Sequence, residues 1–478
     1  MKEKASGVEE SIQNLNKQIQ DGLDSLESMR REKINFRNSE ELQAYEQKVG
    51  RQTDQLAGLL TGLKIQESLA SPEMQEEGLK LVKSHPKRMR NQGVNEVEIK
   101  PLRGSSVRIK STYYSPKNVS RSRSRKRKRA AGIYPGLVLM GIYDGYTPAM
   151  VSEMSTMAVL VSSFEEASKV LESRGNNIDP KTLRSITYRT AQRARLLQQN
   201  KDFKLGVGES LNGRRVVISS DGGRIRIRKN KRGQKTKKGR SHYSTSWREP
   251  KLLIIYTVNE KGEMDRKYAP FIDGTLRGPD AIFALLTYYL SQLQISKADK
   301  ILFIADGAPW IWRRLPKLLK DLGLSADQVY EAIDFYHAVE HLGKVAALRK
   351  SWSATERKKW VKHQRKLLLK GRVSEVISAV EELCRGRSGK AITRERNYFI
   401  KNRHRMDYAK LLDLGLPIGS GAMESAIRRV VNLRLKGPGI FWHRENAEAM
   451  IMLRSYYKAG RWNILNNMAF TASIPVAA

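Results

Sequence analysis

The 478-residue sequence predicts a mixed α/β fold in which a sheet-containing core is flanked by helical regions. Short apolar runs at 216–219, 251–258 and 300–307 have the length and composition of buried strands. Longer stretches before and after these runs have apolar residues three or four positions apart, which predicts amphipathic helices. We therefore expect one core of strands and helices in a chain that is otherwise mainly helical.

Residues 1–90 are predicted to be helical. Apolar residues recur three or four positions apart from Val8 to Met29 and again from Leu42 to Leu69. This spacing is typical of a helical hairpin, which we favour over a dimeric coiled coil because no clean heptad persists.

Residues 91–135 are predicted to contain short strands and a basic linker. The segment VEIKPLRGSSVRIKSTYYSP alternates like two strands around a Gly-Ser-Ser turn. The tract SRSRSRKRKR at 120–129 has no acid, and we expect it to contact phosphates.

Residues 136–205 are predicted to form helices. Ser163 and Asp179 precede amphipathic runs as N-caps, and Gly175 lies between the two runs. This outline is that of a helix-turn-helix DNA-binding region or of an ordinary helical hairpin. The second helix carries several bases: Lys181, Arg184, Arg189, Arg193 and Arg195.

Residues 210–350 are predicted to form the first part of the core. The expected order is three strands (216–219, 251–258, 267–272), a helix (279–293), a strand (300–307), a helix (310–322), a strand (328–334) and a helix (338–348). Three strands followed by alternating helices and strands is the order of the ribonuclease-H-like fold. A helical, basic insertion at 351–415 follows, and 416–478 supplies the second part of the core and a tail.

Two aspartates lie at predicted strand ends, Asp221 in ISSDGG and Asp306 in FIADGA. Acids at the carboxyl ends of strands in α/β sheets are placed for ligands, and the following glycines leave room for a metal or a phosphate. Each Asp-Gly alone is also an ordinary turn. The pair on neighbouring strands favours a metal site.

Glu424 is the best candidate for a third acid, because it lies in the first turn of a helix after Gly419-Ser420-Gly421. An acid there also complements the helix dipole without any further role. Less well placed competitors are Asp407, Asp413, Glu445 and Glu448.

The motif Asp334-Phe335-Tyr336-His337 ends the last predicted strand. The imidazole of His337 is placed to bond a phosphate oxygen or to position an acid. His341, four residues later, suggests a metal pair, but two histidines on a helix without thiolates are a weak zinc signal.

The stretch from Arg224 to Arg240 has ten basic residues and no acid, which predicts a hairpin arm or loop that binds DNA phosphates. The expected DNA-binding residues are Lys229, Lys231, Arg232, Lys235, Lys237, Lys238 and Arg240, with Arg428 and Arg429 on the helix after Glu424.

Composition restricts the function classes. A net charge of +39 indicates a polyanionic partner, nucleic acid before a membrane surface. No stretch of about 18 uncharged apolar residues predicts a membrane span, and the charged N-terminus does not resemble a secretory signal. A single cysteine, Cys384, excludes a disulfide framework and fits a reducing cytosol.

The motifs ISSDGG, ADGAPWIW, DFYH and GSGAMES, in this order and with a helical insertion before the last, resemble the DDE transposases of bacterial insertion sequences. Within the Mutator-like superfamily the chain looks most like the Kra-type insertion-sequence family, over residues 130–460. The resemblance implies a catalytic triad of Asp221, Asp306 and Glu424, with Asp334 and His337 in the family's C/DxxH motif. Relatives often carry a Cys-rich zinc ribbon ahead of the catalytic domain, whereas residues 95–130 contain no cysteine.

The resemblance implies Mg²⁺-dependent DNA strand cleavage and strand transfer at terminal inverted repeats. Two Mg²⁺ ions, replaceable by Mn²⁺, would be held by the three acids. We expect double-stranded DNA, both transposon ends and target, as partner, a homodimer or higher oligomer on DNA, no membrane association, and a cytoplasmic, nucleoid-associated location. The alternatives are an inactive transposase-derived DNA-binding regulator and a nucleic-acid nuclease of the same fold.

Overall fold

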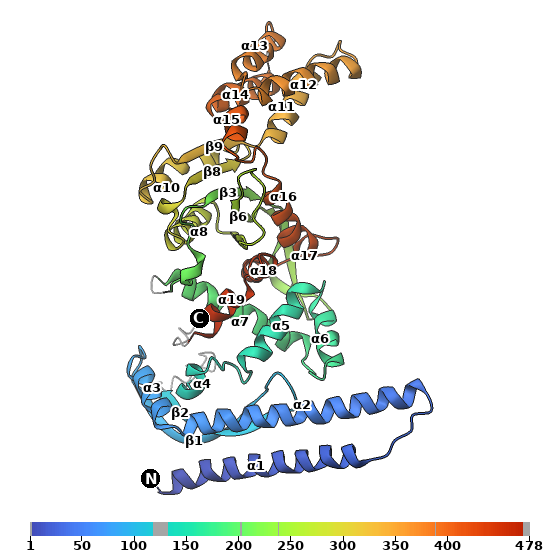
Figure 1. The fold of residues 1–478 in the computed structure, drawn as a ribbon, viewed down its shortest axis with the longest axis vertical. Coiled ribbons are helices and arrows are strands. Elements are labelled where there is room, and N and C mark those ends of the chain that lie inside the picture. Colours follow the sequence, from blue (N-terminus) through green and yellow to red (C-terminus); the bar gives the residue numbers. More distant parts are fainter. Residues whose placement is uncertain (1, 118–131, 201–202, 238, 388, 472–478) are drawn as a thin grey trace. The chain divides into compact units, whose positions relative to one another are not determined.

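The computed structural model describes residues 2–117, 132–200, 203–237, 239–387 and 389–471 (Figure 1). It is a mixed α/β structure that divides into two compact units, residues 1–200 with 465–478 and residues 201–464. The predicted C-terminal segment 416–478 is thus split, because its last residues belong to the first unit. Among the helices in the described ranges, none has the length and apolar character that a membrane span requires.

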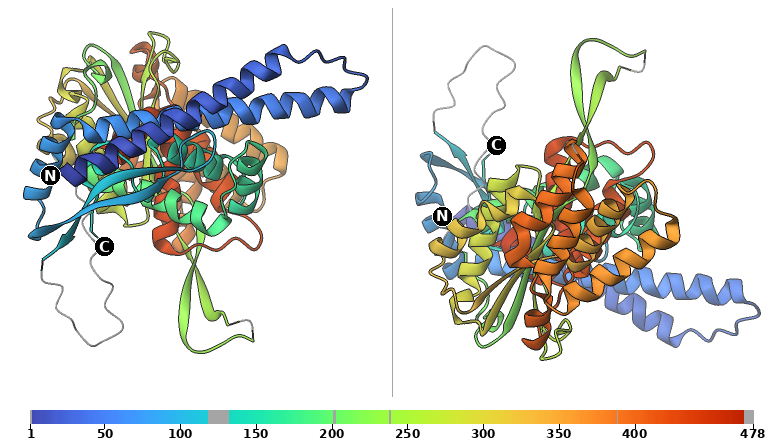
Figure 2. Two further views of the ribbon diagram at one scale, coloured as in Figure 1. Left: turned by 90° about the horizontal axis from the view of Figure 1, so that it is seen from below. Right: turned by 90° about the horizontal axis from the view of Figure 1, so that it is seen from above.

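The first unit begins with a long helical hairpin and a β-hairpin. Its first elements are α1 (Lys2–Arg31), α2 (Ser39–Ala70), α3 (Pro72–Lys83), β1 (Met89–Ile99), β2 (Val107–Pro116) and α4 (Pro135–Leu139). Figures 1 and 2 show α1 and α2 side by side, so the predicted helical hairpin is confirmed. The two predicted strands are confirmed too, although β1 starts earlier than expected. The basic tract 120–129 lies outside the described residues.

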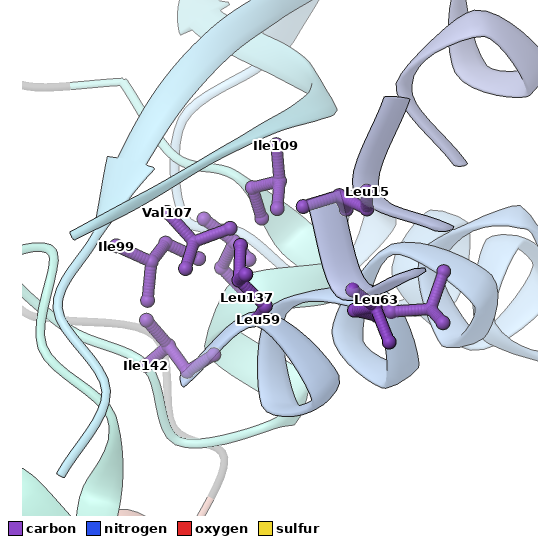
Figure 3. Packing of buried hydrophobic residues seen from close by; sticks show 9 residues of the cluster. Leu15, Leu59, Leu63, Ile99, Val107, Ile109, Leu137 and Ile142 are labelled. Atoms are coloured by element: carbon purple, nitrogen blue, oxygen red, sulfur yellow. The ribbon is translucent and has the colours of Figure 1, made fainter. Parts of the chain in front are cut away.

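An apolar cluster joins α1, α2, the β-hairpin and α4 (Figure 3). Leu15 of α1 and Leu59 and Leu63 of α2 are buried against Ile99 and Ile109 of the β-hairpin. Because the cluster joins both hairpins, the α1–α2 pair is part of a folded core.

The helical region at 136–205 contains α5 (Pro148–Leu160), α6 (Phe164–Ser173) and α7 (Pro180–Gln199). Both predicted N-caps are confirmed: the Ser163 side chain accepts from the Glu166 N–H, and Asp179 accepts from the N–H groups of Lys181 and Thr182. The caps fix where α6 and α7 begin.

Two arginines of α7 bind other residues of the same unit. Asp144 accepts a 2.5 Å bond from Arg189 and pairs with Arg193, whose guanidinium also lies 4.5 Å from the centroid of the Tyr143 ring. Lys181 and Arg184 are exposed. The predicted basic recognition face is therefore reduced to the N-terminal part of α7.

The second unit contains a five-stranded mixed sheet in the order β7-β6-β3-β8-β9. Its strands are β3 (Arg215–Gly222), β6 (Lys251–Val258), β7 (Phe271–Thr275), β8 (Lys300–Ala305) and β9 (Val329–Ile333). β3 pairs antiparallel with β6 and β6 antiparallel with β7, while β8 is parallel to both β3 and β9. All eight residues of β6 are buried, as the apolar run from Leu252 to Tyr256 predicts.

Two predicted elements of the core are wrong in detail. The third strand was expected at 267–272 but begins at Phe271, because Pro270 has no N–H to donate to a ladder. The helix expected at 310–322 is divided into α9 (Pro309–Trp312) and α10 (Leu315–Asp321). Pro316 lies in the first turn of α10, where its missing N–H is tolerated.

Helices complete the second unit. They are α8 (Pro279–Gln292), α11 (Phe335–Ala347), the insertion helices α12 (Ala354–Leu369), α13 (Val373–Cys384), α14 (Lys390–Asn402) and α15 (Tyr408–Asp413), and the short turns η1 (Val207–Glu209), η2 (Ile295–Lys297) and η3 (Arg403–Arg405). The insertion is a packed helical subdomain: Leu368, Val376 and Phe399 are each fully buried. A capping box of Ser353 and Glu356 begins it.

A continuous helical stretch carries Glu424. It consists of α16 (Gly421–Ile427), the π-helical turn η4 (Arg428–Asn432) and α17 (Leu433–Leu435). A π-helical turn frees backbone carbonyls, and the buried Arg454 of α18 (Arg444–Lys458) donates to two of them, Arg429 O and Val430 O. The chain returns to the first unit within α19 (Trp462–Phe470).

Candidate active site at the carboxyl edge of the sheet

Three aspartates gather at one edge of the sheet. Asp221 is the penultimate residue of β3, Asp306 follows β8 and Asp334 follows β9. Because these three strands are adjacent and parallel, their carboxyl ends meet at the same edge. The strand register therefore brings together the two acids that the sequence singled out.

Asp221 is the most strongly perturbed acid of the site. Burial raises its pKa to about 6, and the charges of Asp306 and Glu249 act in the same direction. A 2.6 Å bond from the Gly222 N–H and the nearby His337 oppose the rise. A half-buried carboxylate close to a second one is typical of a functional site.

Asp306 is fixed by the turn that follows it. Its Oδ1 accepts from the Ala308 N–H at 3.0 Å, and its carbonyl accepts from Trp312 Nε1 at 2.8 Å. The sequence ADGAPWIW therefore holds this carboxylate through its own backbone and one tryptophan.

Asp334 has a positioning role. It is 1% exposed, caps α11 by accepting from the His337 N–H at 2.8 Å, and accepts from the Ser420 N–H. The Phe335 N–H donates to Ile418 O at 2.9 Å. Asp334 thus joins the start of α11 to the Gly-Ser-Gly turn that leads into α16.

Glu424 lies in the first turn of α16, which packs against β3 and β6 through the buried Met423 and Ala426. The Glu424 side chain itself is exposed. Within the described ranges, no three Asp, Glu, His or Cys side chains are grouped so that they could hold a metal ion. The structure brings Asp221 and Asp306 together, and it does not bring Glu424 into a closed triad with them.

Two competitors of Glu424 have other partners. Glu448 accepts from Thr275 Oγ1 and from the Leu276 N–H, both at 2.6 Å. Asp407 caps α15 by accepting from the Lys410 N–H. Asp413 and Glu445 are exposed side chains.

The glycines after the two aspartates do not leave open space, contrary to our expectation. A Cβ atom on Gly222 would clash with the Glu249 carboxylate, and one on Gly307 would lie 2.5 Å from Cε2 of Tyr398. The space that glycine provides is filled by two side chains that the sequence analysis missed. Their distance along the chain from the motifs explains why no local pattern indicated them.

Tyr398 belongs to a layer contributed by the insertion. Its ring stacks on His341 with centroids 3.7 Å apart, and His341 Nδ1 lies 2.5 Å from the Glu395 carboxylate. Burial lowers the pKa of His341, and because the Glu395 carboxylate can only accept, Nδ1 is the donor of this bond. The His337 and His341 rings are 6.5 Å apart, and His341 is already occupied, which does not favour the histidine metal pair.

The hydroxyl of Tyr398 is buried and has no hydrogen-bond partner among the described residues. Burial raises its pKa, and the charges of Asp306 and Asp334 add to that rise. The Tyr398 hydroxyl shares this state with the buried hydroxyls of Tyr288 and Tyr408.

Lys251 is a buried lysine at the start of β6. It is opposite Gly222 in the β3–β6 register, its Nζ lies 2.6 Å from Glu249 Oε1, and Nζ is 4.2 Å from the centroid of the Trp310 ring. Its side chain is only 7% exposed, and its charge is paired with the Glu249 carboxylate.

The predicted basic arm is a β-hairpin made of β4 (Ile225–Lys235) and β5 (Ser241–Arg248), shown in Figure 2. Of the predicted DNA-binding residues of this arm, Lys229, Lys231, Arg232, Lys235, Lys237 and Arg240 are exposed, and Lys238 lies outside the described residues. The second strand was not predicted, because its Ser/Thr-rich polar sequence gives no buried face.

The two helix arginines differ in their surroundings. Arg428 is exposed, but Arg429 donates to Ser425 O and to Lys458 O. Arg429 therefore links η4 to the end of α18. Of the two, Arg428 is the one available to a ligand in this structure.

The donor set at the sheet edge fits a hard divalent cation. Mg²⁺ in proteins is held by one or two carboxylates together with substrate phosphates and water, and Asp221 and Asp306 supply two carboxylates on rigid strands. A scan of protein-family models and a search of curated proteins found no match to this chain.

Proposed function

We propose that this chain is a DDE-type DNA transposase that cleaves and joins DNA strands at the ends of its element. The observation that carries the proposal is the pairing of Asp221 with Asp306 across the adjacent parallel strands β3 and β8, with a charged arm inserted directly after Asp221. Paired carboxylates on a rigid edge suit metal-assisted phosphodiester chemistry.

The sheet supports the proposal because its order matches the fold that the sequence predicts. Two antiparallel pairings on one side of β3 and two parallel pairings on the other are the arrangement expected of a ribonuclease-H-like core. The helical insertion between α11 and α16 has the position that the resemblance to Kra-type transposases implies.

In the proposed site Asp221, Asp306 and Glu424 would hold the two Mg²⁺ ions. The ions, when bound, would stabilise charge on the attacking and leaving oxygens of the phosphodiester. Asp334 positions the α16 turn through Ser420, and His337 lies close enough to Asp221 to influence its charge. The exposed lysines and arginines of the arm bind the phosphates that flank the cleavage position.

The alternative is a transposase-derived DNA-binding regulator that does not cleave. The two functions share the arm and differ only in strand cleavage.

The test is to incubate the purified full chain with double-stranded DNA that spans the ends of its own element and flanking sequence, with Mg²⁺, with Mn²⁺ and with chelator. A transposase cuts at the element ends, only with metal, and joins the liberated 3′ ends to target DNA. Specific binding without cutting identifies the regulator, and cutting at random positions or preferential cutting of RNA identifies a nuclease.

A further inference from the structure

The β4–β5 hairpin has two chemically different faces. In its register Arg226 is opposite Trp247, Arg228 opposite Thr245, and Asn230 opposite Tyr243. Directly opposed residues share a face of a β-ribbon, so two arginines and two aromatic rings line one side. The other side begins with Ile225 and Ile227, which are 0% and 8% exposed.

On this side, each arginine side chain packs against an aromatic ring. The Arg226 guanidinium lies 5.6 Å from the Trp247 ring centroid and 4.6 Å from that of Phe441, and the Arg228 guanidinium lies 5.5 Å from the Tyr243 ring. The rings of Tyr243 and Phe441 are 5.7 Å apart. We call Arg226, Arg228, Tyr243, Trp247 and Phe441 the arginine–aromatic face.

This face is held in place at its base. The Arg228 N–H donates to Trp442 O at 2.9 Å, the Trp442 N–H donates to Arg226 O at 3.0 Å, and Arg228 Nε lies 2.9 Å from His443 Nε2. The backbone that carries both arginines is therefore fixed before any ligand binds, which lowers the ordering cost of binding.

Folding of the hairpin does not account for the two rings. Trp247 is 50% exposed and Tyr243 43% exposed, while the buried isoleucines already anchor the ribbon. Residues 224–248 contain eleven Lys and Arg residues and no acid, so the surroundings favour a polyanion. Phosphate binding needs only the charges and leaves the exposed rings unexplained.

We propose that the arginine–aromatic face binds unpaired DNA bases by stacking, next to the phosphates held by the arm's lysines. Aromatic side chains stack on any base, and guanidinium groups add to that stacking, but bases inside a duplex do not present their faces. The inference rests on the proposed function and adds to it a site for the single-stranded DNA exposed when a strand is cut or frayed.

The experiment measures binding of the full chain to a blunt DNA duplex and to the same duplex with a four-nucleotide single-stranded extension, by fluorescence anisotropy over a range of salt. The wild type is expected to bind the extended duplex more tightly. Trp247→Ala should lose roughly 5- to 150-fold in affinity for the extended duplex, the range for one base stack, and change little on the blunt one. Tyr243→Ala should act in the same direction.

Two controls separate stacking from charge and from misfolding. Trp247→Phe retains a ring and should keep the preference for the extended duplex. Lys231→Gln removes a charge from the same hairpin and should weaken binding to both duplexes equally. Circular dichroism and the melting temperature check that each variant is folded.

Equal affinity of the wild type for the two duplexes, or an equal loss on both for Trp247→Ala, would overturn the stacking site while leaving the proposed function intact. An RNA extension that binds in place of the DNA extension would overturn the assignment to DNA. Failure to bind either duplex in a salt-dependent manner would instead remove the proposed function.

Discussion

The ring of Tyr398, from insertion helix α14, lies against Gly307, so that a Cβ atom at Gly307 would be 2.5 Å from Cε2 of Tyr398. Gly307 directly follows Asp306 at the end of β8. The insertion therefore packs against the turn that fixes one of the two paired carboxylates.

Gly307→Ala is expected to destabilise the protein by about 1–3 kcal/mol, because the added methyl group overpacks the Tyr398 ring. It should also reduce DNA cleavage by moving Asp306. Urea unfolding and a cleavage assay measure the two effects. Gly343→Ala in α11 is the matched control, since nothing lies within 4 Å of its added Cβ. The double variant Gly307→Ala/Tyr398→Ala should not show the additional loss of stability caused by Gly307→Ala. If that loss persists without the Tyr398 ring, contact between the added methyl group and this ring is not its cause.

Tyr398→Phe is expected to leave the protein as stable as wild type or more stable by about 1 kcal/mol, because it removes a buried hydroxyl without a described partner. Tyr289→Phe is the control of opposite sign: its hydroxyl donates to Asp273 Oδ2 at 2.8 Å, so that variant should be destabilised. Thermal unfolding of both variants measures the difference. Equal losses would show that the Tyr398 hydroxyl has a partner in the free protein.

The difference in stability between the wild type and Asp221→Asn is expected to depend on pH. Burial raises the folded-state pKa of Asp221 to about 6, above its unfolded value, so the folded protein binds a proton more tightly. The stability of the wild type relative to Asp221→Asn should be highest below pH 4 and fall by about 3 kcal/mol as the pH rises through 6. Asp299→Asn is the control, because the bond from Lys300 lowers that pKa and any change lies below pH 4. A flat difference between pH 4 and 7 would contradict the assigned burial of Asp221.

Asp334→Ala is expected to cost about 2 kcal/mol or more and to reduce cleavage strongly, because it removes a helix cap and the anchor for the Ser420 N–H together. Ser353→Ala removes the cap of α12 and should cost about 1 kcal/mol without affecting cleavage. Unfolding and cleavage are measured on both. Full cleavage by folded Asp334→Ala would show that the anchor does not position Glu424.

Neutralising Lys229, Lys231 and Lys235 together should weaken binding to any DNA. In the counterion-release description, the slope of log K against log salt falls by about 0.9 for each phosphate that the variant no longer neutralises, or about 2.7 for three. Exchanging three exposed lysines of α12, Lys358, Lys359 and Lys362, for glutamine controls for net charge. An unchanged slope in the arm variant would mean that these lysines do not bind phosphates.

Much of the core could be predicted from local sequence. The strand at 251–258 is mostly apolar, and the caps at Ser163 and Asp179 mark helix starts with a specific chemistry, so their positions were predicted to within a residue or two. The start of the strand after Pro270 and the break before Leu315 depend on prolines, which have no N–H to donate, and these boundaries were misplaced.

The site could be predicted only in part. Strand-end aspartates are visible in sequence, but Glu249, Lys251 and Tyr398 reach the same edge through tertiary packing. The hairpin strand 241–248 was missed because its side chains are exposed on both faces and show no apolar alternation. The α7 arginines were predicted to face DNA, but Arg189 binds Asp144, which lies more than forty residues earlier in the sequence, where no local pattern links the two.

The most direct test of the central claim compares Mg²⁺-dependent cleavage by the wild type, Asp221→Asn, Asp306→Asn and Glu424→Gln on DNA that carries the element's own ends. The amide variants keep shape but lose the charge that holds a cation, so each should lose roughly a hundredfold or more in cleavage while its DNA affinity stays near that of wild type. Cleavage at the wild-type rate by Asp221→Asn or Asp306→Asn would contradict the proposal, because the paired carboxylates at the edge of the sheet would then have no part in the reaction.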